Sequence, residues 1–135
     1  RAVRAAHARG VPVFAECGGF LYLNRLLDGY PMAGILGGES ENKHRPVRFG
    51  YVELEAGEDT LVAGKGARLR GHEFHYYDCT ENGEAFTARR KGGEYRCFAA
   101  GQNLVAGFPH IHFYSNLECA ATFYKNCLKA KESRI

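Results

Sequence analysis

Residues 11–23 of the chain read VPVFAECGGFLYL. A short apolar run ends at Cys17, two glycines follow, and apolar residues at helical spacing begin at Phe20. This order is typical of a nucleophile elbow, a sharp strand-to-helix turn that lifts one side chain above the end of a sheet. Glycines after the cysteine let the backbone turn without a Cβ clash. The stretch therefore predicts an α/β fold with Cys17 as a candidate nucleophile.

The same pattern fits a second interpretation. Free cysteine is among the most buried residue types, so Cys17 is also a candidate structural core residue. The helix N-terminus favours the reactive interpretation, because its free N–H groups and dipole stabilise a thiolate or an oxyanion. The local pattern alone leaves both interpretations open.

Composition limits the class of protein. The chain has 135 residues, of which 45% are hydrophobic and 24% charged, as in one soluble globular domain. A net charge of +3 without a long basic run argues against a nucleic-acid partner. We find no stretch as long as a membrane span and no signal peptide, so no membrane partner is expected. Five cysteines without CxxC spacing favour a reducing compartment, and we predict a cytoplasmic location.

Periodicity and turn residues predict the secondary structure. The segment 32–46, rich in glycine and polar residues, is expected to be an irregular, mobile loop. Ser115, with Glu118 three residues later, matches a capping box at the start of the last helix. The expected elements are helices at about 1–9, 18–27 and 115–129, strands at about 11–16, 48–55, 68–78 and 103–108, and a hairpin of residues 85–90 and 95–99.

Histidines are the candidate partners of Cys17. His110 and His112 follow the last predicted strand, where α/β sheets place catalytic groups. His72 and His75 lie in a predicted strand, and together with Glu73 they raise the alternative of a metal site. Strand residues two apart share a face and residues three apart do not. His72 and His75 therefore could not easily join the other pair, and we favour a metal-free cysteine site.

Four motifs in a fixed order carry a family resemblance. The chain resembles the C-terminal glutaminase domain of the cobyrinic acid a,c-diamide synthase family, a class I (triad-type) glutamine amidotransferase, over about residues 1–125. The resemblance implies a flavodoxin-like α/β sheet with helices. The motifs are AECGG (residues 15–19), FGYV (49–52), RGHEFHY (70–76) and HIHF (110–113).

The resemblance also implies a chemistry. Cys17 matches the nucleophile that attacks the glutamine carboxamide and forms a γ-glutamyl thioester, and ammonia then leaves for a synthetase domain. His110 matches the family's histidine in a Phe-x-His pattern, with His112 as the alternative. A histidine within reach of the thiol can activate it and protonate the departing amine. The Gly18 backbone N–H is the expected oxyanion donor.

Two positions depart from the general class. Ala15 stands where most class I enzymes have glycine. The cobyrinate branch resembles this chain at that position. His112 stands where many have a glutamate that orients the histidine, so the third catalytic residue is absent or comes from elsewhere. Glu73 is one candidate, and a strand carboxylate paired with an arginine is its alternative role. His75 is a candidate supporting residue.

The chain begins inside an amphipathic segment without an initiator methionine, so residues 1–135 are expected to be a partial amidotransferase domain. The resemblance places a strand with the second oxyanion donor, and an ATP-dependent synthetase domain that binds ATP, magnesium and the corrinoid, upstream of Arg1. No cofactor is expected in residues 1–135, because no Walker sequence is present. An unpaired strand edge would favour self-association into a homo-oligomer.

Other functions remain open at this point. The same chemistry could serve another tetrapyrrole, such as nickel-sirohydrochlorin or hydrogenobyrinate. The scaffold could also carry a peptidase or amidase, or it could be a non-catalytic binding domain in which Cys17 is structural.

Overall fold

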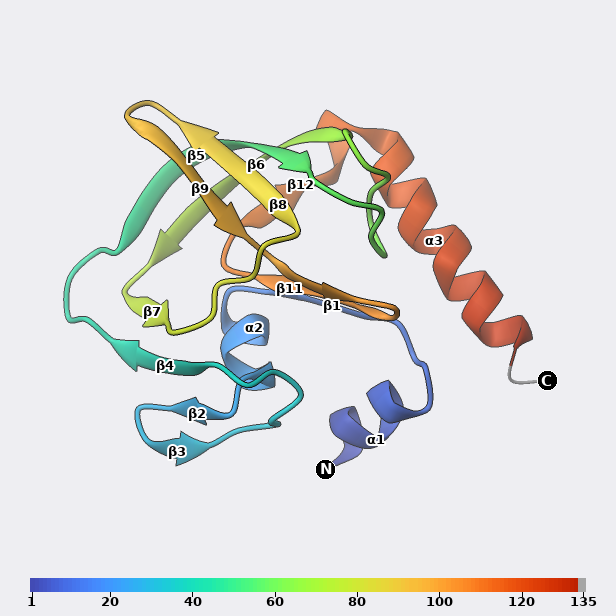
Figure 1. Ribbon diagram of the computed structural model, residues 1–135, viewed down its shortest axis with the longest axis horizontal. Helices are drawn as coiled ribbons and strands as arrows, with labels where there is room; N and C mark the ends of the chain where they lie inside the picture. Colours follow the sequence, from blue (N-terminus) through green and yellow to red (C-terminus); the bar gives the residue numbers. More distant parts are fainter. Residues whose placement is uncertain (134–135) are drawn as a thin grey trace.

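The structure is a computed structural model that describes residues 1–133, and it is a mixed α/β fold. The predicted fold class is confirmed. Figure 1 shows β1 and β11 side by side in the middle of the molecule, with a larger sheet above them, short strands below and α3 along one side. The helices are α1 (Ala2–Ala8), α2 (Gly18–Leu23), α3 (Leu117–Glu132) and the 3-10 helix η1 (Phe113–Ser115).

The strands of the described residues form three sheets. The first has the order β1-β11-β10, the second β12-β6-β5-β8-β9, and the third β3-β2-β4-β7. The pairs β1–β11 and β2–β4 are parallel, and the other strand pairs are antiparallel. The strands are β1 (Val13–Glu16), β2 (Leu26–Leu27), β3 (Tyr30–Pro31), β4 (Glu39–Asn42), β5 (Arg48–Ala56), β6 (Arg68–His75), β7 (Tyr77–Cys79), β8 (Phe86–Arg90), β9 (Gly93–Cys97), β10 (Ala99–Gly101), β11 (Leu104–Gly107) and β12 (His110–His112).

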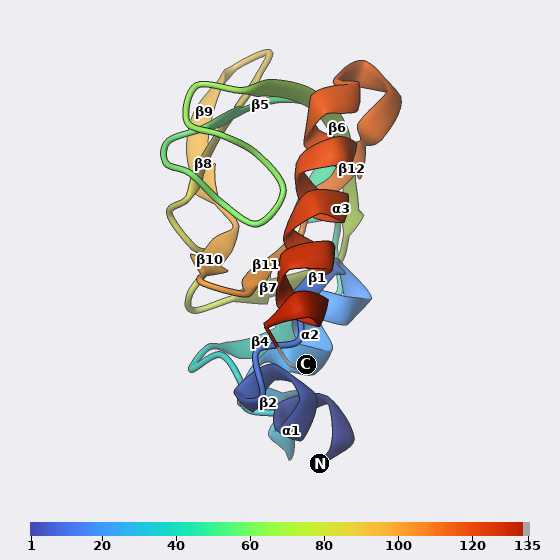
Figure 2. The same ribbon diagram turned by 90° about the vertical axis from the view of Figure 1, so that its right-hand side faces the viewer.

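The central parallel pair separates two hydrophobic cores. Phe14 and Val105 point into the core between the five-stranded sheet and α3, where Phe14 contacts Phe113 and Phe123 edge-on or tilted. Their neighbours on β1 and β11 alternate to the other core, which surrounds α2. Figure 2 shows α3, which covers the first of these cores, along the side of the molecule that faces the viewer. Cys17 thus follows a strand that is packed on both faces.

The strand prediction for residues 68–78 is confirmed for its first eight residues. In β6 the side chains alternate strictly between exposed and buried, from Arg68 to His75. The chain then leaves the sheet at Tyr76, and β7 pairs with β4 instead. The predicted hairpin is confirmed as β8 and β9, whereas Ala99–Gly101 belongs to β10 in the first sheet.

The prediction of a helix through residue 27 was wrong. Helix α2 ends at Leu23, and Leu26–Leu27 is the strand β2. Asn24 is fully buried, and its side-chain amide donates to Ser40 Oγ at 3.2 Å. The Arg25 N–H donates to the Gly38 carbonyl at 2.9 Å. These long-range bonds end the helix, although Leu26 and Leu27 continue its apolar spacing.

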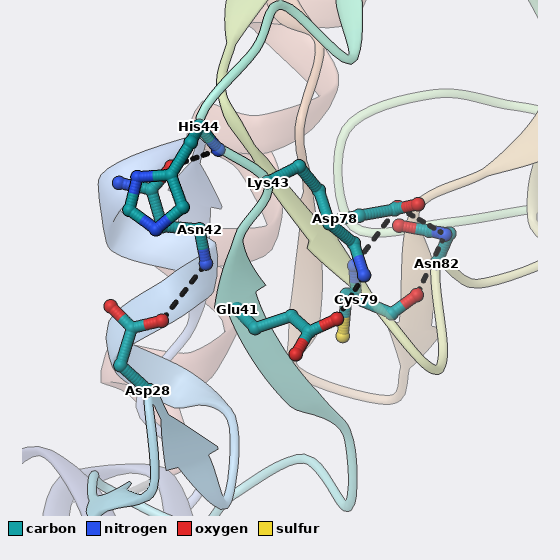
Figure 3. Close-up of polar contacts among 8 residues, drawn as sticks. All are labelled: Asp28, Glu41, Asn42, Lys43, His44, Asp78, Cys79 and Asn82. Carbon is teal, nitrogen blue, oxygen red and sulfur yellow. Dashed lines mark hydrogen bonds and ion pairs between the residues drawn. The ribbon is translucent and has the colours of Figure 1, made fainter.

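The prediction that residues 32–46 are an irregular loop was also wrong in part, because β4 lies within this segment. Figure 3 shows its polar contacts. The Asn42 N–H donates to Asp28 Oδ1 at 2.9 Å, and the His44 N–H donates to Asn42 Oδ1 at 2.8 Å. After the neighbouring strand β7, the Asn82 side chain donates to the carbonyl of its last residue, Cys79, at 3.1 Å. Side chains distant in sequence therefore order a segment whose own composition favours a loop.

The last helix begins later than predicted. Asn116 is the N-cap, and its side chain accepts from the Glu118 N–H at 3.1 Å. Ser115 cannot cap the helix, because its hydroxyl accepts from the Arg70 N–H and donates to the His112 carbonyl. Within residues 1–133, no helix is long and apolar enough to cross a membrane.

The close approach of β6 and β12 depends on Gly71. A Cβ at this position would lie 2.5 Å from the His110 carbonyl oxygen, closer than side chains tolerate. We expect Gly71→Ala to push β12 away and to lower the free energy of unfolding by about 1–3 kcal/mol. Chemical denaturation measures the loss. The control is Gly64→Ala, whose Cβ would make only an ordinary 3.7 Å contact with Asp59. Equal stabilities of the two variants would contradict the prediction.

Candidate functional site

Cys17 has the backbone geometry of an elbow. Its φ of 46° and ψ of −106° lie in a region that non-glycine residues rarely occupy. Its N–H donates to the Gly107 carbonyl at 2.8 Å, and its carbonyl accepts from the Leu21 N–H at 2.9 Å. The residue is thus fixed between the end of β1 and the first turn of α2. Such strain clusters at functional sites and favours the reactive interpretation.

The two glycines after Cys17 have different surroundings. A Cβ on Gly19 would stand 3.3 Å from the Ala15 Cβ, so this position is close to the strand. A Cβ on Gly18 would meet nothing within 4 Å, so the space beside its Cα is open. The helix behind them is anchored by Phe20, which is fully buried and packs edge-on against Phe108 with ring centroids 5.0 Å apart.

The surroundings of Cys17 disfavour the thiolate form of its side chain. Burial raises the pKa of the Cys17 thiol, the Gly18 N–H lowers it, and the carboxylates of Glu16 and Glu73 raise it further. The net direction is upward. The helix start therefore does not by itself make a thiolate, and a base is needed to remove the proton. All five cysteines of the chain are free thiols.

This upward shift predicts the pH dependence of alkylation. A raised thiol pKa leaves less thiolate at neutral pH, so the rate of Cys17 alkylation by iodoacetamide should reach half its maximum above about pH 8.5, the value of an unperturbed cysteine. Mass spectrometry of the Cys17 peptide between pH 6 and 11 measures this midpoint. A midpoint below pH 8.5 would show a preformed thiolate instead.

His110 lies at the start of β12, a short strand that the sequence did not predict. It pairs with His72 across the sheet, and the two imidazole rings stack with centroids 4.8 Å apart. Its Nδ1 lies 3.8 Å from Oε2 of Glu16, the residue before Cys17. Because Glu16 directly precedes Cys17, this contact places His110 beside the elbow. Sequence reasoning missed Glu16, and the available signal was an acidic residue at the end of an apolar strand.

Glu73 lies near enough to raise the pKa of the Cys17 thiol, but its own contacts are with residues other than His110. It is 2% exposed on the inner face of β6, where Tyr95 Oη donates to Oε2. Its Oε1 is 3.4 Å from His75 Nε2, and His75 Nδ1 is 2.7 Å from the Tyr77 carbonyl oxygen. The structure pairs Glu73 with a tyrosine and a histidine, whereas the sequence alternative was an arginine. It does not bring Glu73 to His110.

His75 supports the segment before His110 from below. Its ring stacks on Phe108 with centroids 3.9 Å apart. Because Nδ1 faces a carbonyl oxygen, it must donate. The remaining Nε2 lies 3.4 Å from Glu73 Oε1, and among the described residues neither of these two buried atoms has a hydrogen-bond partner. His75 and Glu73 thus form a buried polar unit beneath Phe108.

The remaining histidines separate as strand geometry predicts. His72 is exposed and His75 is buried, so they lie on opposite faces of β6. His112 shares the face of His110 but pairs with Arg70, two residues from His72 along β6. Within residues 1–133, no three His, Cys, Asp or Glu side chains converge to hold a metal ion.

A cysteine on a strained strand-to-helix turn, with a histidine from a later strand nearby, is typical of α/β enzymes that use a cysteine nucleophile, a class that includes glutamine amidotransferases. Comparison with protein families supports this class: the model of the CobB/CobQ-like glutamine amidotransferase domain matches residues 1–118. The chain belongs to this family. The predicted family is confirmed, and with it the glutamine amidotransferase class of the domain.

Individual relatives agree with the family. The chain is 37% identical over 126 residues to cobyrinate a,c-diamide synthase of Listeria innocua, which covers 86% of this chain and 28% of that protein. It is 40% identical over 122 residues to the protein of the same name from Salmonella typhimurium, covering 82% and 27%. For Caldanaerobacter subterraneus the identity is 36% over 136 residues, covering 94% and 30%. The chain thus spans less than a third of the length of these relatives.

Proposed function

We propose that the chain is the glutaminase part of an ATP-dependent amidotransferase. It hydrolyses glutamine through a thioester on Cys17 and supplies ammonia for amidation of the a and c carboxylates of cobyrinic acid. The observation that carries the proposal is the strained backbone of Cys17 at the junction of β1 and α2, with His110 tied to the preceding residue. The names of the relatives support the substrate.

The proposed reaction assigns a role to each group. His110 takes the proton of the Cys17 thiol as the sulfur attacks the glutamine carboxamide. The Gly18 N–H, which already faces the sulfur, donates to the oxyanion of the tetrahedral intermediate. His110 then gives its proton to the departing ammonia, and water releases glutamate from the thioester. The open space beside Gly18 leaves room for the substrate oxygen.

The proposal extends to a partner. Ammonia released at Cys17 would be used by a synthetase portion of the full-length protein, which would bind ATP, magnesium and the corrinoid. The support is that the relatives are more than three times as long as the matched segment. Glu73, His75 and His112 are given no direct chemical step. Glu73 and His75 support the Phe108 segment, and His112 lies two pairs beyond His110.

Mass mapping with a diazo-ketone analogue of glutamine tests the proposal. We expect selective labelling of Cys17 among the five cysteines, and excess glutamine should prevent it. The chain and the full-length protein are compared, because labelling only in the latter would show that the rest of the protein completes the site. Absence of selective labelling in both would favour a structural role for Cys17. Labelling by peptide-based reagents alone would favour a peptidase.

A further inference from the structure

Glu16 makes two contacts with the start of β12, one from each carboxylate oxygen. Oε1 accepts the Ile111 N–H at 2.6 Å. Oε2 lies 3.8 Å from Nδ1 of His110. Glu16 is the last residue of β1, which belongs to the first sheet, whereas β12 belongs to the second. One carboxylate therefore ties the strand of the cysteine to the strand of the histidine.

No other carboxylate of residues 1–133 lies within ion-pair distance of His110. Glu73, the acid that the sequence offered, is engaged by Tyr95 and His75 on the buried face of β6. We propose that Glu16 is the positioning residue of this site and holds His110 in the tautomer whose Nε2 is free to accept the Cys17 proton. This inference rests on the proposed glutaminase function.

The tautomer follows from hydrogen-bond chemistry. An ionised carboxylate only accepts hydrogen bonds, so the imidazole nitrogen that faces it must carry the proton. In His110 this nitrogen is Nδ1, which leaves the lone pair on Nε2. At 3.8 Å the contact is longer than a hydrogen bond, and catalytic hydrogen bonds are often long without substrate and tighten when it binds. The bond from Ile111 fixes the carboxylate, so His110 has a fixed partner.

Glu16 occupies this place at an electrostatic cost. Burial raises the pKa of its carboxyl, while the Ile111 N–H and the imidazoles of His110 and His72 lower it in part. A raised carboxyl pKa means that the ionised form is less favourable in the folded chain than in the unfolded chain. Glu16 therefore does not improve folding stability above that pKa, and such a trade-off is common at functional sites.

Glutamine at position 16 should reverse the tautomer. Its carbonyl oxygen can still accept the Ile111 N–H, so its NH₂ group takes the place of Oε2. An amide NH₂ donates, and the facing Nδ1 of His110 must then accept. The proton moves to Nε2, the nitrogen that the reaction needs unprotonated. Glu16→Gln thus changes the chemistry with little change in shape.

Nitrogen NMR of the ¹⁵N-histidine-labelled chain tests the inference, at a pH where the imidazoles are neutral. The signals of His110 are assigned by their loss in His110→Gln. We expect the Nδ1–H tautomer in the wild type and the Nε2–H tautomer in Glu16→Gln. The matched control is Glu53→Gln, which removes an exposed carboxylate from β5, in the same sheet as His110. It should leave the His110 tautomer unchanged. Glu73→Gln tests the rival acid, and a change there alone would overturn the inference.

A wild-type chain with the Nε2–H tautomer also overturns the inference, and this result does not depend on how Glu16→Gln folds. Kinetics give the second readout: Glu16→Gln should lower kcat for glutamine hydrolysis by about 10²–10⁴-fold with little change in KM, because the base is then in the wrong tautomer. Glutamine-protected labelling of Cys17 with an unmoved tautomer would overturn the role of Glu16 and leave the proposed function intact. If Glu16→Gln reverses the tautomer but Cys17 shows no glutamine-protected labelling, the proposed glutaminase function is wrong. The contact between Glu16 and His110 would still stand.

Discussion

Replacing Cys17 by serine is expected to abolish glutamine-dependent amidation by the full-length protein, with a loss of at least about 10⁴-fold in rate. A serine hydroxyl in the same strained turn has no partner basic enough to make it an equivalent nucleophile, so the thioester route is closed. The measurement is product formation with glutamine or with ammonium salts as the nitrogen source. Ammonia should still support amidation, because it enters after the step that Cys17 performs.

The matched control for this experiment is Cys127→Ser, which changes a partly buried cysteine on α3 instead. It should retain both activities. Equal loss with glutamine and with ammonia in Cys17→Ser would mean that the variant damages the protein as a whole. In that case Cys17 has a structural role, as its second interpretation holds.

Replacing His110 by glutamine is expected to lower kcat for glutamine hydrolysis by about 10²–10⁴-fold, the usual contribution of a general acid–base residue. Burial raises the pKa of the Cys17 thiol, so the resting protein holds little thiolate and depends on a base during attack. The rate of Cys17 labelling by the diazo-ketone analogue should fall in parallel. Both rates are measured on protein whose folding is checked by circular dichroism.

The matched variant is His112→Gln, which removes the other imidazole of the same strand. We expect it to retain most of the activity, because His112 lies beside Arg70 and away from Glu16. A larger loss in His112→Gln than in His110→Gln would reverse the assignment of the two histidines.

Local pattern was sufficient where one segment determines its own structure. The elbow at Cys17 was predictable because an apolar strand, two glycines and a helical apolar spacing occur in succession. The alternation of β6 was predictable because a strand with one buried face places every second side chain inside. The family followed from the order of four short motifs, and the match over residues 1–118 confirmed it.

Local pattern failed where distant contacts compete with periodicity. Leu26 and Leu27 extend the spacing of α2, but the buried Asn24 and its bond to Ser40 end the helix before them. The capping box at Ser115 was wrong because its hydroxyl is used by Arg70, 45 positions away. Neither partner can be identified from the neighbouring residues.

The sequence by itself determined the α/β class, the elbow, the family and the candidate residues Cys17 and His110, since these depend on residue order and short-range periodicity. Only the tertiary structure decided which acid accompanies His110. Glu16 and Ile111 are 95 positions apart and meet because the end of β1 lies beside the start of β12, while Glu73 lies on the buried face of its strand. Strand register sets which side chains meet across two sheets, and register depends on the packing of the whole chain.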